Sequence, residues 1–128
     1  MNIPEVKKKC PAILVVDDDN INQRLIYYHL SEISDKILFA GNGREALNVY
    51  SENPDVCVIL MDLVMPIMNG VEASAKIREM NPEAVIIALS AFREEENEYG
   101  SNEIGFSGYL TKPIKKEVLI ETVLKYID

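Results

Sequence analysis

The sequence has few cysteines, no tryptophan and no long apolar run. Two cysteines, Cys10 and Cys57, are too few for a disulfide framework and lack metal-ligand spacing, so we expect reduced thiols in a reducing compartment. The longest apolar runs, Val56–Met61 and Ala84–Leu89, are six residues each, whereas a membrane span needs about 20. These absences predict a cytoplasmic protein with no membrane insertion.

Positive charge is also scarce. The chain carries 13 Lys and Arg against 21 Asp and Glu, a formal net charge of −8. Its basic residues form a run only at positions 7–9. Because nucleic-acid binding depends on Lys and Arg that neutralise phosphates, this charge balance argues against direct binding of DNA or RNA. The excess of acidic residues needs another explanation.

The chain does contain enough apolar residues for one ordinary core. It has 128 residues, near the commonest domain length, and 48% of them are hydrophobic. Because its apolar runs lack polar alternation, we expect both faces of each strand to be buried, as in a parallel sheet covered by helices. The runs predicted to be strands are Ala12–Val16, Lys36–Ala40, Val56–Met61, Ala84–Leu89 and Ser107–Thr111.

The segments between these runs have helical spacing. Ile21, Leu25 and Tyr28, for example, place apolar side chains on one helical face. Asn-Pro pairs at 53–54 and 81–82 favour helix ends just before strands, because the residue before proline avoids the α region. The pattern predicts an α/β domain of type (βα)5 over residues 12–128, after a lead segment at 1–11, with no room for an output domain.

Polar side chains follow four of the five predicted strands. Asp17–Asp19 follow the first strand, Asp62 the third, Ser90 the fourth and Lys112 the fifth. In an open parallel sheet, ligands bind beyond the carboxyl ends of the strands. We therefore expect these side chains to converge on one rim of the molecule.

The chemistry of this set indicates a phosphoryl site. Clustered carboxylates repel one another, and a hard divalent cation with oxygen ligands, typically Mg²⁺, relieves the repulsion. Lys112 and Ser90 suit the oxygens of a tetrahedral anion. The sequence has no Gly-x-x-x-x-Gly-Lys-Ser/Thr loop, which argues against a bound nucleotide as the phosphoryl source. A carboxylate can itself accept the group, and Asp62, alone at its strand end, is the natural acceptor.

Each of these residues has a simpler explanation when taken alone. Asp17–Asp19 would serve as helix N-cap acids, and we expect that role for Asp19 in particular. Asp62 would be an ordinary turn residue and Lys112 a solvated loop lysine. Their joint position at the ends of different strands is what favours a functional site.

Four motifs carry a resemblance to a known family. They resemble the receiver domain of two-component response regulators, most of all the receivers associated with hybrid histidine kinases, and the match covers residues 12–127. The resemblance implies a flavodoxin-like, doubly wound fold, with a five-stranded parallel sheet in the order 2-1-3-4-5 and helices on both faces. The matching stretches are Ile13–Asp18, Leu60–Gly70, Leu89–Ala91 and Tyr109–Ile114.

The resemblance also implies a role for each acidic residue. Asp62 would accept a phosphoryl group from a phosphohistidine on a histidine kinase or a histidine phosphotransfer protein. Asp18, Asp62 and the backbone carbonyl of Val64 would ligate Mg²⁺, with Mn²⁺ as an alternative ion, and Asp17 would assist through water. The chain would then be a phosphoacceptor signalling domain that assists its own phosphorylation and dephosphorylation, rather than an enzyme acting on a separate substrate.

The remaining site residues would couple phosphorylation to signalling. Lys112, in a cis peptide bond with Pro113, and Ser90 would each bind a phosphoryl oxygen. Ser90 and Tyr109 would then move, altering the face formed by the fourth helix, the fifth strand and the fifth helix for a downstream partner that the sequence does not identify. The family resemblance also allows for a homodimer.

One alternative comes from a different class. Asp17–Asp19 after a strand also fits the Asp-x-Asp nucleophile motif of haloacid-dehalogenase-like phosphatases, in which Asp17 would be phosphorylated. The short chain and the unexplained Asp62–Gly70 run count against this hypothesis. Phosphorylation of Asp17 rather than Asp62 would favour it.

Overall fold

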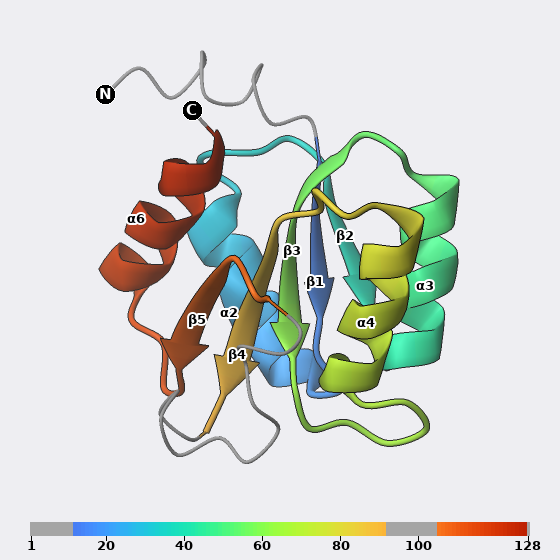
Figure 1. The fold of residues 1–128 in the computed structure, drawn as a ribbon. Helices are drawn as coiled ribbons and strands as arrows, with labels where there is room; N and C mark the ends of the chain where they lie inside the picture. The colour runs from blue at the N-terminus through green and yellow to red at the C-terminus, as the bar shows by residue number, and fades with distance from the viewer. Residues whose placement is uncertain (1–11, 92–104, 128) are drawn as a thin grey trace.

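The computed structural model describes residues 12–91 and 105–127. Strands and helices alternate along most of this chain (Figure 1). In chain order the elements are β1 Ala12–Val16, α2 Asn20–Leu30, β2 Ile37–Ala40, α3 Gly43–Glu52, β3 Val56–Asp62, α4 Gly70–Met80, β4 Ile86–Ser90, β5 Gly108–Thr111 and α6 Lys116–Ile127.

The five strands form one parallel sheet in the order β2-β1-β3-β4-β5, which confirms the predicted fold. The register brings the strand ends together: Val16 pairs with Met61, Asp62 with Leu89, and Ser90 with Thr111. The carboxyl ends of β1, β3, β4 and β5 therefore lie along one edge of the sheet, where the polar residues were expected to meet.

Both faces of the sheet are buried, as the unbroken apolar runs predicted. Ile13 and Val15 pack with residues of α2 and α6 in one core, and Leu14 and Val16 pack with residues of α3 and α4 in the other. Figure 1 shows these helix pairs on opposite sides of the sheet. All five residues of β1 have no exposed surface, so the strand that leads into the acidic cluster is held rigidly between two layers.

Local signals fix the helix ends. Asn42 and Asn69 cap the starts of α3 and α4, each accepting a 2.9 Å hydrogen bond from a backbone N–H three residues on. The same two helices end just before Asn53 and Asn81, the residues that precede proline, as the sequence predicted.

Some expectations about the elements need correction. β4 begins at Ile86 rather than Ala84, because the Ala84 N–H is taken up by the Asn81 carbonyl in the preceding turn, at 3.1 Å.

The prediction of a reduced thiol at Cys57 is wrong: this residue, half-buried near the start of β3, is disulfide-bonded. Cysteine counting alone does not determine pairing.

The helix expected between the fourth and fifth strands falls on 92–104, outside the described residues. Of the helices that the structure describes, none has the length and apolarity to cross a membrane.

Candidate functional site

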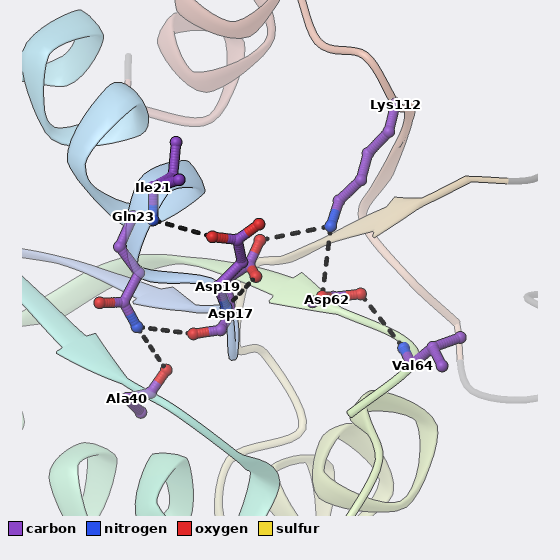
Figure 2. A network of polar contacts seen from close by, with 8 residues as sticks. All are labelled: Asp17, Asp19, Ile21, Gln23, Ala40, Asp62, Val64 and Lys112. Carbon is purple, nitrogen blue, oxygen red and sulfur yellow. Dashed lines mark hydrogen bonds and ion pairs between the residues drawn. The ribbon is translucent and has the colours of Figure 1, made fainter. Parts of the chain in front are cut away.

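The predicted acidic and basic side chains meet beyond the carboxyl ends of the strands (Figure 2). The Lys112 Nζ lies 3.3 Å from Asp17 Oδ2 and 3.2 Å from Asp62 Oδ2, so one ammonium bridges two carboxylates. Asp17 and Asp62 are buried, whereas Asp18 beside them is exposed. Residues separated by up to 95 positions in the sequence thus form one cluster.

Three carboxylates of this cluster can share an ion. Asp17, Asp18 and Asp62 each offer an oxygen atom, and these oxygens all lie within 4.8 Å of one another. Hard oxygen donors of this kind are what Mg²⁺ requires, and a site with few protein ligands leaves positions open for water and phosphate oxygens. The donor set therefore fits the predicted cation.

The charges of the cluster are not balanced by the protein alone. Burial raises the pKa of Asp62, and the attraction of Lys112 and the hydrogen bond from the Val64 N–H offset this rise only in part. Burial lowers the pKa of Lys112, but the attraction of Asp62 and Asp17 outweighs that effect, so its net pKa is raised. The two shifts agree physically: Lys112 has two carboxylate partners, whereas each carboxylate has only a share of one ammonium.

The loop between β1 and α2 holds Asp17 in place. Asp17 Oδ1 accepts a 2.9 Å hydrogen bond from the Asp19 N–H, and Asp19 caps α2 by accepting from the Ile21 N–H at 2.8 Å. The capping role predicted for Asp19 is therefore confirmed. Gln23 Nε2 donates to the Asp17 carbonyl at 2.6 Å and lies 3.3 Å from the Ala40 carbonyl, which ties the loop to β2 (Figure 2).

The loop between β3 and α4 wraps closely around Asp62. The Val64 N–H donates to Asp62 Oδ1 at 3.1 Å, and the Gly70 N–H donates to the Leu63 carbonyl at 3.1 Å. A Cβ atom on Gly70 would lie 2.0 Å from the Asp62 carbonyl oxygen. Glycine is thus required at this position by the close approach of two backbones.

Ile67, in the same loop, has an unusual backbone conformation. Its φ is +68°, in the left-handed region, and its side chain is 71% exposed. This conformation costs an L-residue about 1–2 kcal/mol, and a β-branched side chain there is a genuine outlier. The sequence pattern gave no indication of this strain.

Ser90 and Tyr109 belong to β4 and β5, the two strands next to β3 at this side of the sheet. Ser90 is buried at the end of β4, and its carbonyl accepts a 2.6 Å hydrogen bond from the Lys112 N–H. The Lys112–Pro113 peptide bond is cis, as the resemblance implied. Tyr109 is half-buried, pairs with Ala88 and precedes Lys112 by three residues.

A family model for the response regulator receiver domain matches residues 13–124. This chain belongs to the receiver domain family. Receivers generally bind Mg²⁺ at an acidic cluster, and the aspartates described above form such a group. The family model lends no support to the phosphatase alternative.

Curated relatives of this receiver include both short and long proteins. The chemotaxis protein CheY of Halobacterium salinarum is 35% identical over 112 residues, which cover 87% of this chain and 92% of that protein. The autoinducer 1 sensor kinase/phosphatase LuxN of Vibrio harveyi is 36% identical over 109 residues, which cover 85% of this chain but only 13% of LuxN. The receiver thus spans most of one relative and a small part of the other.

Solved structures share the fold of this receiver. The chemotaxis protein CheY4 of Vibrio cholerae superposes with a TM-score of 0.83 at 26% identity, covering 91% of this chain and 98% of that one. A chain from the complex of the Saccharomyces cerevisiae phosphotransfer protein Ypd1 with the receiver domain of Ssk1 has a TM-score of 0.81 at 28% identity, covering 91% and 88%.

Proposed function

We propose that this receiver accepts a phosphoryl group on Asp62 from a phosphohistidine of a histidine kinase or a phosphotransfer protein. The observation that carries the proposal is the position of the Asp62 carboxylate, which lies 3.2 Å from the Lys112 ammonium and within 4.8 Å of two further acidic oxygens. A carboxylate so placed has both a cationic partner and further acidic oxygens beside it, which supports this role. The structural similarity to a receiver solved with Ypd1 supports a donor of this class.

The transfer exchanges one bond to phosphorus for another. An oxygen of the Asp62 carboxylate attacks phosphorus, a P–O bond forms and the P–N bond of the phosphohistidine breaks. The departing imidazole nitrogen keeps the electron pair and takes a proton from solvent. Lys112, which bridges Asp17 and Asp62 in the structure, then pairs with a phosphoryl oxygen and neutralises charge in the transition state.

The metal ligands follow from the same cluster. Asp18, Asp62 and the backbone carbonyl of Val64 would hold Mg²⁺, or Mn²⁺ in its place, and Asp17 would assist through water. When bound, the cation neutralises charge on the carboxylates and on the phosphoryl oxygens. Asp18 is the exposed member of the cluster, so it would offer a cation its first ligand from solvent.

Signalling depends on a change of population between two states. Ser90 binds a phosphoryl oxygen through its hydroxyl, and Tyr109 turns inward on β5, which changes the surface around β5 and α6. The phosphoryl group stabilises one state more than the other, and it shifts the equilibrium by that difference. The receiver, comprising residues 12–128 after a lead segment at 1–11, therefore acts as a phosphoacceptor that assists its own phosphorylation and dephosphorylation.

Incubation with Mg²⁺ and a small acyl phosphate, followed by intact mass measurement, tests the proposal. We expect the wild-type chain to gain the mass of one phosphoryl group and the Asp62→Asn variant to gain none. Asp55→Asn is the matched control, because Asp55 is partly exposed and pairs with Lys36 on the surface. An adduct that survives in Asp62→Asn, or that forms equally without Mg²⁺, would refute the proposal. A label on Asp17 would revive the phosphatase alternative.

A further inference from the structure

A single side-chain amide joins the carboxyl ends of β1 and β2. Gln23 Nε2 donates to the Asp17 carbonyl at 2.6 Å and to the Ala40 carbonyl at 3.3 Å (Figure 2). The Ala40 carbonyl also accepts a 3.0 Å hydrogen bond from the Asp17 N–H, directly after the last paired residues of the two strands. The amide therefore adds one further contact between β1 and β2, at the point where the acidic loop begins.

The backbone that this amide holds carries two of the three clustered carboxylates. Asp17 is fully buried, and its two carboxylate oxygens lie 2.9 Å from the Asp19 N–H and 3.3 Å from the Lys112 ammonium. Asp18 follows directly, so the position of the Asp17 carbonyl limits where the Asp18 carboxylate can lie. Asp62, the third member, comes from β3. The distance between the two groups of ligands thus depends on how firmly the end of β1 is held.

The packing of α2 against β2 has a separate source. Tyr27 follows Gln23 by four residues, on the same face of α2. Its ring lies against that of Phe39 in β2, with centroids 6.2 Å apart. This ring contact joins the helix to the strand, whereas the amide acts on the strand ends. The geometry therefore favours a role of Gln23 in the acidic site over a role in helix packing.

Glutamine suits this position because its amide donates hydrogen bonds without carrying charge. A lysine or arginine here would be attracted to the neighbouring carboxylates and would compete with a metal ion for them. The amide nitrogen of Gln23 donates instead to two backbone carbonyls. The carboxylate oxygens are thereby left to Lys112 and to a cation.

We propose that Gln23 is a positioning residue for the metal site: by holding the Asp17 carbonyl at the end of β2, it sets the affinity of the acidic cluster for Mg²⁺. This inference rests on the proposed function, in which the ion assists transfer to Asp62. Groups that orient metal ligands through hydrogen bonds typically change metal affinity about 10–100-fold when they are substituted. We expect about tenfold, because Gln23 acts through the backbone and not on a ligand atom.

Titration with Mn²⁺, with the free ion followed by electron paramagnetic resonance, measures this affinity without phosphorylation. Gln23→Met keeps the length of the side chain and removes its N–H donors, and we expect the Kd for Mn²⁺ to rise about tenfold. An equal Kd in Gln23→Met and wild type, or no binding of Mn²⁺ to wild type, would overturn the inference.

Asn53→Leu is the matched control, because it removes the same kind of bond elsewhere. Asn53 Nδ2 donates to the Val49 carbonyl at 2.8 Å, where α3 ends and before β3 begins. This contact lies at the end of the sheet opposite to the acidic cluster, so we expect the Kd for Mn²⁺ to stay that of wild type. A rise of the same size in both variants would show a general loss of stability and would also overturn the inference.

Labelling by a small acyl phosphate separates affinity from rate. In Gln23→Met we expect the Mg²⁺ concentration for half-maximal labelling to rise about tenfold, and the rate at saturating Mg²⁺ to stay within about twofold of wild type. A lower saturating rate with an unchanged half-maximal concentration would contradict the positioning role. Failure of the acyl phosphate to label Asp62 in wild type would refute the proposed function, whereas a difference in Mn²⁺ affinity would still support the role of Gln23.

Discussion

Asp62 is a buried carboxylate whose surroundings favour function over stability. Burial raises its pKa, and the nearby Asp17 carboxylate acts in the same direction. Lys112 and one backbone N–H compensate only in part. Charged groups arranged in this way are typical of functional sites, because a structural ion pair would be balanced within the protein.

This imbalance predicts that Asp62→Asn stabilises the metal-free protein at neutral pH. Because the pKa of Asp62 is higher in the folded than in the unfolded state, its ionised form destabilises the fold. The penalty is complete above the raised pKa and vanishes below the unfolded pKa of about 3.9. Melting curves in chelator should therefore show the advantage of the variant shrinking as the pH falls from neutrality toward that value. An advantage that is independent of pH, or that grows on acidification, would contradict this account.

Individual residues differ in how far the sequence revealed them. Asp17, Asp62 and Lys112 were predictable because strand ends in a parallel sheet share one edge, so position along the chain determined position in space. Gln23 was not predicted, since its side chain acts on two backbone carbonyls that come from different strands. The strain at Ile67 was also hidden, because nothing in an isoleucine side chain signals a positive φ.

At the scale of elements, the loop from β3 to α4 is constrained by its backbone conformation and by close backbone contacts. It leaves Asp62, reverses direction at Ile67 and re-enters the core at Gly70. A Cβ atom on Gly70 would collide with the Asp62 carbonyl oxygen. Apolar runs determine the strands, and asparagine caps determine where α3 and α4 begin. Their existence and order were therefore predictable, whereas the path of this loop was not.

Gly70→Ala is expected to destabilise the receiver by about 3 kcal/mol, which lowers its melting temperature by about 10 °C. The added Cβ meets backbone atoms of Asp62 and Leu63 rather than a flexible side chain, so the loop or the helix has to move. Displacement of Asp62 should also slow labelling by a small acyl phosphate. Gly41→Ala is the control, because a Cβ there has no atom within 4 Å. Equal melting temperatures for the two variants would contradict the proposed constraint.

At the scale of the whole molecule, the net charge of −8 has two parts. Asp17, Asp18 and Asp62 concentrate negative charge at one edge of the sheet, while other acidic residues, such as Glu32 and Asp55, are exposed or partly exposed and pair with surface lysines. The composition predicted only that nucleic acid was an improbable partner. The distribution of charge in the fold adds that a cation is the complementary ligand of this edge.

Mg²⁺ should consequently raise the free energy of unfolding of the receiver by more than NaCl does at the same ionic strength. Binding to the folded state alone stabilises by about 2.7 kcal/mol when the free ion is 100 times its Kd. Because screening also relieves the repulsion within an acidic chain, the comparison requires NaCl at matched ionic strength. We expect melting temperature to rise with Mg²⁺ in the wild type and in Asp55→Asn, and to rise no more than with NaCl in Asp18→Asn. Asp18 is the decisive position because it is exposed, so its substitution removes a proposed ligand without opening a cavity. Equal responses to Mg²⁺ in all three proteins would show that the ion acts on the net charge and not on this cluster.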